Sequence, residues 1–261
     1  MNQGCDRLKI ARTFGAASHS YDVSARLQRY SGKHLMAWLP QKEALTVLDL
    51  GSGTGFFTNI LSSKYQQVIG LDISTKMLQY AKENRDQRIR WVEGDAFTLP
   101  FADNSIDLIY SNLVIQWFDP LEKALDEIMR VLKPDGQFIF STLSDGTLYE
   151  LKSSWAQVDD DSHVNDFKTL NELHDAIGRC PATLINQSSK DIILEYESVM
   201  HLAHELKGLG ANRVNDKQKK GLAGKDKWKK MMNSYQDFQE PNGIYPATYK
   251  VFSAQLVKQF S

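Results

Sequence analysis

One stretch of sequence constrains the fold more than any other: a short apolar segment that runs directly into a glycine-rich turn. Residues 44–50 are rich in Leu and Val and end at Gly51-Ser-Gly-Thr-Gly55. Glycines let the backbone take positive φ and let a ligand approach without interference from a Cβ atom. Such turns also serve packing alone in many α/β proteins, so this turn by itself leaves a nucleotide-type ligand and a structural role about equally open.

Around this turn the sequence alternates between expected strands and expected helices. The strands are residues 44–50, 68–72, 89–92, 106–111 and 137–142, and the helices follow Gly55, surround Met77 and span 121–132, with a turn at 133–136. Helical crossovers of this length give a parallel sheet with helices on both faces. The core is therefore predicted to be an α/β domain over about residues 40–145.

The flanking segments are less regular. Residues 23–39 are expected to form one amphipathic helix, with an apolar face made by Val23, Leu27, Tyr30, Leu35 and Trp38. Residues 147–180 look helical and polar, and late strands are expected at 192–196 and 249–257. Because there is no internal repeat and no low-complexity linker, one domain with embellishments over residues 1–261 is preferred to two.

Composition excludes several classes of protein. The chain has 31 Lys and Arg against 32 Asp and Glu. It therefore lacks the excess of basic residues that would indicate nucleic-acid binding. No segment resembles a signal peptide or approaches the ~18 apolar residues of a membrane-spanning helix. Cys5 and Cys180 are far apart without metal-type spacing, which favours free thiols in a reducing compartment. A cytoplasmic location, no membrane and no bound metal are expected.

Three acidic residues follow three of the expected strands. Asp72 can accept hydrogen bonds from both hydroxyls of a ribose, and Asp49 suits a cationic amino-acid moiety better than a pyrophosphate. Asp95 can accept from an adenine amine, although an Asx turn explains it better when it is taken alone. Together with Gly51, Gly53 and Gly55, these acids fit one ligand.

This combination resembles the class I S-adenosylmethionine-dependent methyltransferases. The shared segments are Val47–Gly55, Asp72, Gly94–Ala96, Ser111–Leu113 and Leu132–Gly136. The resemblance implies a Rossmann-like sheet of seven strands with helices on both faces, and S-adenosylmethionine as the cofactor. It adds Ile73, Ala96 and Asn112 to the acids and glycines as cofactor-binding candidates.

A narrower resemblance runs through nearly the whole chain, to the malonyl-[acyl-carrier protein] O-methyltransferases of biotin synthesis. It rests on Phe14–Asp22, Leu27–Arg29, Ser111–Trp117, Leu206–Ala211 and Tyr245–Tyr249. It implies methylation of the free carboxylate of a malonyl thioester on acyl-carrier protein. A carboxylate is already ionised near pH 7, so attack on the sulfonium methyl requires no general base, and no acid–base residue is expected.

Such a reaction depends on positioning and on excluding water. The resemblance implies that segment 8–39 closes over the ligand as a lid, through Phe14 and Tyr21. Candidate substrate-positioning residues are Tyr21, Gln116, Trp117, Lys207 and Arg213, of which the last two could pair with the acceptor carboxylate. The ordinary alternatives are a core role for the aromatic residues and a surface position for the cations.

The insert at 212–243 matches no motif. Between Asp216 and Lys230 it has seven lysines against two aspartates. A lysine-rich helical face is usually only solvated, but it could steer an acidic carrier protein. The helical segments 147–180 and 198–243 are expected on the substrate side of the cofactor.

Other functions stay open from the sequence: methylation of another small acid, carbon methylation of a quinone precursor, and non-catalytic S-adenosylmethionine binding. A carbon acceptor would need a base, and none is placed for it. A regulator would tolerate loss of segments 112–117 and 206–211, which are intact. The sequence decides neither the oligomeric state nor the choice between carrier protein and coenzyme A.

Overall fold

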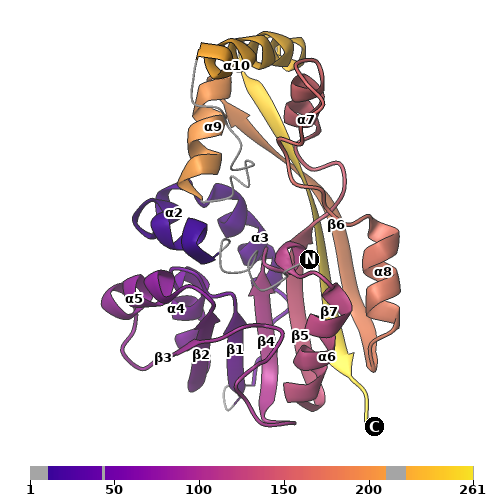
Figure 1. Cartoon of the computed structure of the whole chain (residues 1–261). Coiled ribbons are helices and arrows are strands. Elements are labelled where there is room, and N and C mark those ends of the chain that lie inside the picture. Colours follow the sequence, from indigo (N-terminus) through magenta and orange to yellow (C-terminus); the bar gives the residue numbers. More distant parts are fainter. Residues whose placement is uncertain (1–10, 43–44, 210–221, 261) are drawn as a thin grey trace.

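The computed structural model describes residues 11–42, 45–209 and 222–260, and Figure 1 shows their arrangement. Within these residues the chain forms a seven-stranded sheet with the order β3-β2-β1-β4-β5-β7-β6. Strands β1 to β5 pair in parallel, and β7 lies antiparallel between β5 and β6. The predicted α/β class and the number of strands are confirmed.

The strands of this sheet are β1 (Thr46–Leu50), β2 (Gln67–Asp72), β3 (Arg90–Glu93), β4 (Ile106–Asn112), β5 (Leu132–Leu143), β6 (Ala182–Tyr196) and β7 (Tyr245–Lys258). The α-helices are α2 (Ser18–Ser24), α3 (Arg26–Met36), α4 (Phe56–Ser62), α5 (Thr75–Asn84), α6 (Leu121–Val131), α7 (Tyr149–Ala156), α8 (Leu170–Gly178), α9 (Val199–Gly208) and α10 (Leu222–Tyr235). Residues 11–16 are also helical.

Helices cover both faces of the sheet because the central strands are apolar on both sides. Leu48 and Leu50 of β1 belong to a cluster with residues of α6 and α8, whereas Val47 packs with Leu35 of α3 and Leu61 of α4. A strand that is buried on both faces is rich in apolar residues with little alternation, and residues 45–50 follow this pattern except at Thr46 and Asp49. The parallel sheet therefore places the carboxyl ends of β1, β2, β3 and β4 along one edge.

The helix predicted at residues 23–39 forms only over Arg26–Met36, as α3. The chain breaks at Ala25 (φ −86°, ψ 41°), which ends α2 and begins α3. Leu27 and Leu35 are buried as expected, but Val23 is 81% exposed and Tyr30 is 54% exposed. Because the break turns α2 onto a different course, Val23 no longer shares the buried face of α3, whereas Tyr30 belongs to α3 and lies on its exposed side.

The late strands are longer than their sequence patterns predicted. Strand β6 spans 15 residues and β7 spans 14, and they pair with each other over almost their whole length. The expected turn at residues 133–136 lies inside β5 as a register shift against β4, with Asp135 at φ +62°. Residues 147–180 hold two helices, α7 and α8, with a loop between them.

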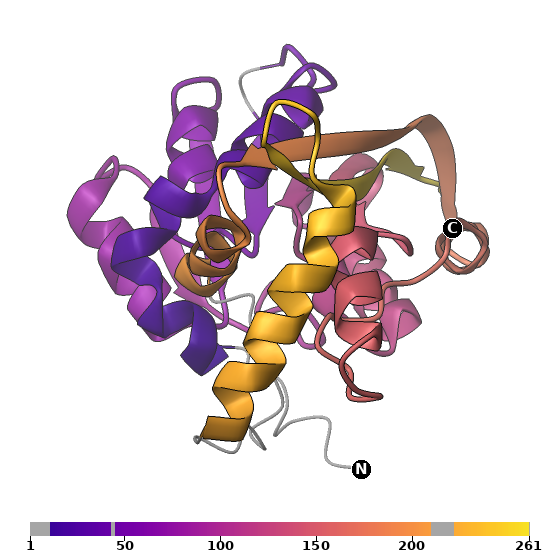
Figure 2. The ribbon, with the colours of Figure 1, turned by 90° about the horizontal axis from the view of Figure 1, so that it is seen from above.

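Strands β6 and β7 continue beyond the rest of the sheet and carry a second group of helices, α7, α9 and α10 (Figure 1). Seen from above, α10 crosses over the top of the molecule (Figure 2). This upper region has a core of its own, which includes Trp155, Tyr196, Leu202, Tyr235 and Tyr249. None of the helices in the described ranges is both long and apolar enough to cross a membrane.

Candidate active site

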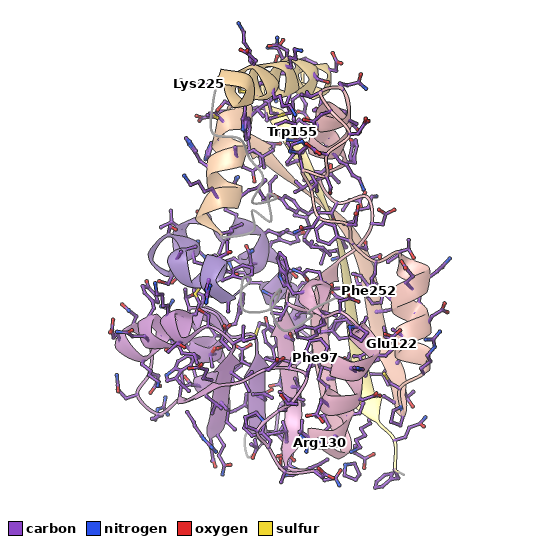
Figure 3. All side chains as sticks on the ribbon, viewed as in Figure 1. Phe97, Glu122, Arg130, Trp155, Lys225 and Phe252 are labelled. Atoms are coloured by element: carbon purple, nitrogen blue, oxygen red, sulfur yellow. The ribbon has the colours of Figure 1, made fainter. Side chains whose placement is uncertain are left out.

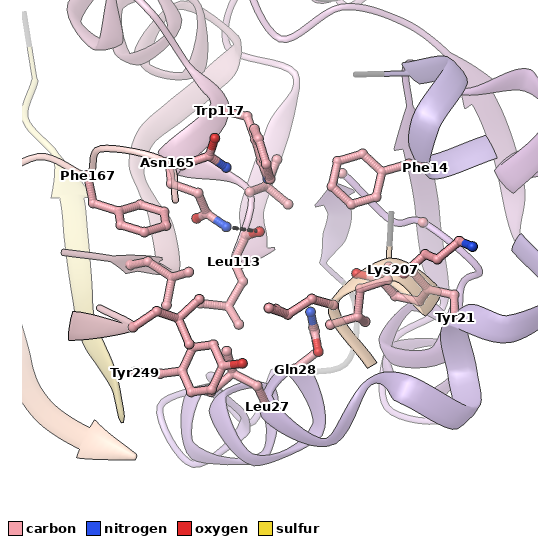
Figure 4. Close-up of a pocket in the computed structure, with 18 of the residues that line it drawn as sticks. Phe14, Tyr21, Leu27, Gln28, Leu113, Trp117, Asn165, Phe167, Lys207 and Tyr249 are labelled. Carbon is pink, nitrogen blue, oxygen red and sulfur yellow. Dashed lines mark hydrogen bonds between the residues drawn. The ribbon is translucent and has the colours of Figure 1, made fainter. Parts of the chain in front are cut away.

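A cavity of about 500 Å³ lies between the carboxyl ends of the strands, the N-terminal helices and the upper region. Figure 4 shows part of its lining, in which Tyr21 and Lys207 lie on one side and Phe167 and Tyr249 on the other. Gly51, Gly53, Asp72 and Asp95 line its lower half, while α7, α9, α10 and β7 contribute to its upper half. A cavity at the carboxyl edge of a parallel sheet is where open α/β folds bind ligands.

Each of the three glycines of the turn is required for a different structural reason. Gly51 has φ +75°, and a Cβ atom there would lie 2.5 Å from Cγ2 of Val114. Gly55 has φ +76° and lies against the ring of Trp91, outside the lining of the main cavity. Gly53 has φ +54°, and a Cβ atom there would meet no protein atom within 4 Å. Of the three, Gly53 leaves the most room for a ligand.

Asp72 joins the glycine turn to the next helix. Its two carboxylate oxygens accept hydrogen bonds from the backbone N–H groups of Gly53 and Ser74, each at 2.8 Å. Burial raises the pKa of Asp72, and these backbone donors partly oppose that rise. A carboxylate has about four lone-pair sites. Asp72 therefore keeps acceptor capacity toward the cavity, which it lines.

Asp49 lies in a smaller recess that shares Gly51, Gly53, Tyr21 and Gln28 with the main cavity. Its carboxylate accepts a 2.5 Å hydrogen bond from the hydroxyl of Thr58. Burial raises its pKa to about 7, a rise that the Thr58 hydrogen bond opposes and the nearby charge of Asp72 reinforces.

Two further acceptors in this recess have no protein partner. They are Oε1 of Gln28 and Oγ of Ser52, both buried. Buried polar atoms without partners are rare, so their clustering beside a carboxylate with a raised pKa indicates a place for a cationic donor.

Ile73, Asp95 and Ala96 all line the main cavity. An oxygen of Asp95 accepts the backbone N–H of Phe97 at 3.0 Å, so the Asx turn that was the structural alternative does form. The ring of Phe97 packs edge-on against Phe118, with centroids 5.8 Å apart, and both rings line the cavity. These positions suit a flat polar ring, with an acid at its edge and apolar surface beside it.

Asn112 lies in the smaller recess rather than the main cavity. Its Nδ2 donates to the carbonyl of Gln28 at 2.9 Å, and its Oδ1 accepts from the hydroxyl of Ser141 at 2.8 Å. The Nδ2 end of the amide therefore ties α3 to the sheet, and the Oδ1 end ties β4 to β5. Its assignment to the cofactor stays a prediction.

The N-terminal segment lies over the cavity and is held there by specific contacts. The ring of Phe14 packs edge-on against Trp117, with centroids 5.4 Å apart. Asp22 accepts a 2.5 Å hydrogen bond from Thr54 of the glycine turn and pairs with Arg85. The hydroxyl of Ser20 donates to the carbonyl of Gly208 in α9 at 3.0 Å, so α2 contacts both halves of the cavity.

The substrate-positioning candidates differ in what they can offer. Nε2 of Gln116 donates to the carbonyl of Leu113 at 2.7 Å, and its Oε1 accepts from Thr142 at 3.3 Å, so this amide is already engaged. Tyr21 lines the cavity, and its pKa lies well above the usual value because burial and the charges of Asp72 and Asp22 disfavour the phenolate. It therefore remains a neutral hydroxyl.

The two candidate cations are placed differently. Lys207 is exposed and lines the cavity, and Figure 4 shows its ammonium on the α2 side, away from Trp117. Arg213 lies outside the described residues, so its role stays a prediction.

Several cavity residues were missed by the sequence analysis. They are Gln28, Trp155, His163, Asn165, Phe167, Trp228 and Tyr249. Gln28 and Tyr249 fall within segments that carried the family resemblance, so that signal could have found them. Trp155, Asn165 and Trp228 stand in irregular or helical segments without a motif, and only the folded chain brings them to the cavity.

Comparison with known proteins identifies the family. Residues 48–140 match the methyltransferase domain family. A malonyl-[acyl-carrier protein] O-methyltransferase from Pectobacterium atrosepticum is 35% identical over 251 residues, which cover 96% of each chain. This chain belongs to the malonyl-[acyl-carrier protein] O-methyltransferase family. The cofactor of this class of enzyme is S-adenosylmethionine.

Two other matches show how long some relatives are and which solved structures share the fold. The biotin biosynthesis bifunctional protein BioHC from Cellvibrio japonicus is 41% identical over 97% of this chain, but only 50% of that relative is covered. The chain thus spans about half the length of the bifunctional relatives that it matches. The solved YcgJ protein from Bacillus subtilis shares the fold, with a TM-score of 0.62 at 22% identity, covering 89% of this chain and all of that one.

The residues present fit S-adenosylmethionine. The recess with Asp49 and the orphan acceptors of Gln28 and Ser52 suits its ammonium. Asp72 is placed to accept from ribose hydroxyls, and the surface around Asp95 and Ala96 suits adenine. The fit depends on buried acceptors that otherwise lack partners, which a cationic amino-acid moiety would satisfy.

Proposed function

We propose that this chain transfers a methyl group from S-adenosylmethionine to the free carboxylate of a malonyl group carried as a thioester on acyl-carrier protein. The product is a methyl ester that hides the charge and lets chain elongation toward pimeloyl synthesis and biotin proceed. The observation that carries the proposal is the match to a malonyl-[acyl-carrier protein] O-methyltransferase over 96% of both chains. The two-part cavity gives it a physical basis.

The proposed reaction needs no acid–base catalyst. When bound, S-adenosylmethionine supplies an electrophilic methyl; a carboxylate oxygen bonds to its carbon while the carbon–sulfur electron pair stays on sulfur. A malonyl carboxylate is ionised near pH 7 and has no proton to lose. Asp49, Gln28 and Ser52 would hold the ammonium, and Asp72 the ribose. The protein contributes orientation and a water-poor site.

We call the lower half of the cavity, with the glycine turn, Asp72 and Asp95, the cofactor half, and the rest of the cavity the acceptor half. Aromatic and apolar side chains make the acceptor half suitable for such a reaction. Phe14, Leu113, Trp117, Trp155 and Trp228 all line the cavity, and we assign Phe14, Leu113 and Trp117 to the place where the acceptor meets the methyl. Excluding water raises the reactivity of a carboxylate, because hydration stabilises its charge more in the ground state than in the transition state, where the charge is spread. A thioester arm, being largely uncharged, suits the apolar upper wall.

Segment 11–30 is proposed to act as a lid. Two contacts support this proposal: the ring of Phe14 packs against Trp117, and the hydroxyl of Thr54 donates to Asp22. Hydrogen exchange over residues 11–30 should slow on addition of S-adenosylmethionine, because the ligand joins the surfaces that this segment covers. Equal protection with and without cofactor would make the segment a permanent part of the core.

Mass spectrometry tests the proposed reaction. Malonyl-acyl-carrier protein incubated with the protein and S-adenosylmethionine should gain one methyl group on the acyl chain. Acetyl-acyl-carrier protein is the matched control, since it has the same carrier and no free carboxylate. No gain on the malonyl substrate, or an equal gain on both, would contradict the proposal. Equal rates with malonyl-coenzyme A would remove only the preference for a carrier protein.

A further inference from the structure

Asn165 presents a polar group to the acceptor half of the cavity, where most of the wall is apolar. It lies in the loop between α7 and α8 and lines the cavity together with Trp117 and Phe167. Figure 4 shows its amide directed toward the Trp117 side. Trp117 follows β4, at the edge where the acceptor has to approach the cofactor.

The amide of Asn165 has no hydrogen bond to any other described residue. Gln116, the candidate amide after β4, is already engaged, because it donates to Leu113 and accepts from Thr142. The lining also includes the exposed side chains of His204 and Lys207 on α9. A polar group on an apolar wall costs free energy unless something pairs with it. Of the amides of Gln116 and Asn165, only that of Asn165 is therefore free to meet a ligand.

The loop holds Asn165 in place from both sides. On one side the ring of His163 stacks on Trp155 at 3.7 Å and its Nε2 pairs with Asp159 at 2.7 Å. On the other side the carbonyl of Lys168 accepts the backbone N–H of Asp145 at 3.0 Å. The neighbouring Val164 is buried. A loop backbone fixed in this way keeps Asn165 at the cavity wall, so less conformational freedom is lost when its amide donates to a substrate.

We propose that Asn165 positions the acceptor, with its Nδ2 donating to the malonyl carboxylate oxygen that stays out of the new bond. This inference rests on the proposed function. The negative charge of the carboxylate disappears as the ester forms, so a cation would stabilise the ground state more than the transition state. A neutral amide orients the carboxylate with a smaller penalty. The site thus selects an acid by a dipole in a dry cavity, rather than by Lys207.

Three variants test this role. Asn165→Ala should lower kcat/KM for malonyl-acyl-carrier protein by roughly 10- to 150-fold, the range for a hydrogen bond to a charged group. It should also weaken binding of that substrate to protein loaded with S-adenosylhomocysteine, measured by calorimetry, with cofactor affinity unchanged. Asp166→Asn is the matched control: Asp166 is exposed and pairs with Lys152 at 2.8 Å, so its loss should alter neither measurement.

Asn165→Asp should make kcat/KM depend on pH in a way that a merely structural role of Asn165 would not produce. At pH 8 the new carboxylate repels the substrate, so the loss should exceed that of Asn165→Ala. As the pH falls toward 5 the new carboxyl gains a proton and can donate, so the ratio of Asn165→Asp to Asn165→Ala should rise at saturating cofactor.

A pH-independent ratio, unchanged substrate binding in Asn165→Ala, or an equal loss in Asp166→Asn would overturn the inference. Failure of the proposed function looks different: the unaltered chain itself would neither bind nor methylate malonyl-acyl-carrier protein, which would overturn both.

Discussion

The two halves of the cavity are built in different ways. The cofactor half comes from residues 49–54, 72–77 and 94–97, which lie at the carboxyl ends of three adjacent strands. The acceptor half comes from residues as far apart as Phe14 and Tyr249, which lie on helices, loops and a strand of the upper region. A parallel sheet aligns strand ends automatically, whereas the acceptor wall exists only when distant segments have packed together.

The halves also differ in their polarity. In the cofactor half, backbone N–H groups and buried carboxylates dominate, as with Asp72 between Gly53 and Ser74. The acceptor half is mainly aromatic, with Trp117, Trp155 and Trp228 in its wall (Figure 3 labels Trp155 beneath α10). The comparison suggests that the lower half fixes which cofactor binds, and the upper half fixes which acid and carrier are accepted.

Removing Asp72 should have the largest effect and should break the cofactor half alone. Asp72→Ala loses two hydrogen bonds to ribose, each worth roughly 1.5–3 kcal/mol because the acceptor is charged. It also releases the backbone groups of Gly53 and Ser74. Calorimetry on a variant with native circular dichroism should show at least a 100-fold weaker affinity for S-adenosylmethionine. Unchanged affinity would remove Asp72 from the site.

Replacing Asp49 should reveal the cost of an acid buried without its ligand. Its raised pKa means that folding favours the protonated form, so this contribution to stability is present at low pH and is lost as the pH rises toward about 7. Asp49→Asn keeps an acceptor for Thr58 and should raise the free energy of unfolding at pH 8 by roughly 2–4 kcal/mol, at about 1.4 kcal/mol per pKa unit.

Denaturant unfolding at pH 5 and pH 8 measures this difference, which should shrink at the lower pH. The same variant should bind S-adenosylmethionine more weakly at pH 8, because the ammonium loses its counter-charge. A stability difference that does not depend on pH would contradict the role of Asp49 ionisation.

Two glycines separate stability from binding within one turn. Both Gly51→Ala and Gly53→Ala incur the cost of a positive φ, roughly 1 kcal/mol. Gly51→Ala adds a clash with Val114 and should lower the free energy of unfolding by about 2–4 kcal/mol. Gly53→Ala meets no protein atom and should chiefly weaken cofactor binding. If thermal unfolding and calorimetry gave the reverse order, the ligand would approach the turn elsewhere.

The smallest effect is expected on the outer surface of the acceptor half. The proposal that α10 steers an acidic carrier protein predicts that Lys225→Gln, Lys229→Gln and Lys230→Gln together slow methylation of malonyl-acyl-carrier protein a few-fold at low salt. Figure 3 shows Lys225 at one end of α10. Lys227 is left unchanged because it pairs with Asp159 at 2.6 Å.

Malonyl-pantetheine is the control substrate for these lysines, because it has no acidic protein to attract. Its rate should be unaffected by the three substitutions, and the effect on the carrier substrate should fade at high salt. If both substrates responded equally, α10 would not be a docking surface. The lysines at 217–220 of the same insert lie outside the described residues.

The sequence by itself determined the fold and the cofactor half. The apolar run before Gly51, the glycines, Asp49 and Asp72 are local signals, and a parallel sheet turns strand ends into neighbours with no further information. Periodicity failed where local pattern and packing disagree. The break at Ala25 exposes Val23, and pairing between β6 and β7 extends both strands well past their apolar residues.

Only the tertiary structure decided which side chains line the acceptor half and which of them are free to meet a ligand. Gln116, a candidate from its position after β4, proves to be engaged by Leu113 and Thr142, while Asn165 in an unremarked loop has its amide free among the described residues. No local sequence pattern shows which amide is left without a partner, because that depends on which distant residues form hydrogen bonds with it in the folded chain. A strand end has its position fixed by hydrogen bonding along the sheet, but a loop side chain gains its function only from the packing that surrounds it.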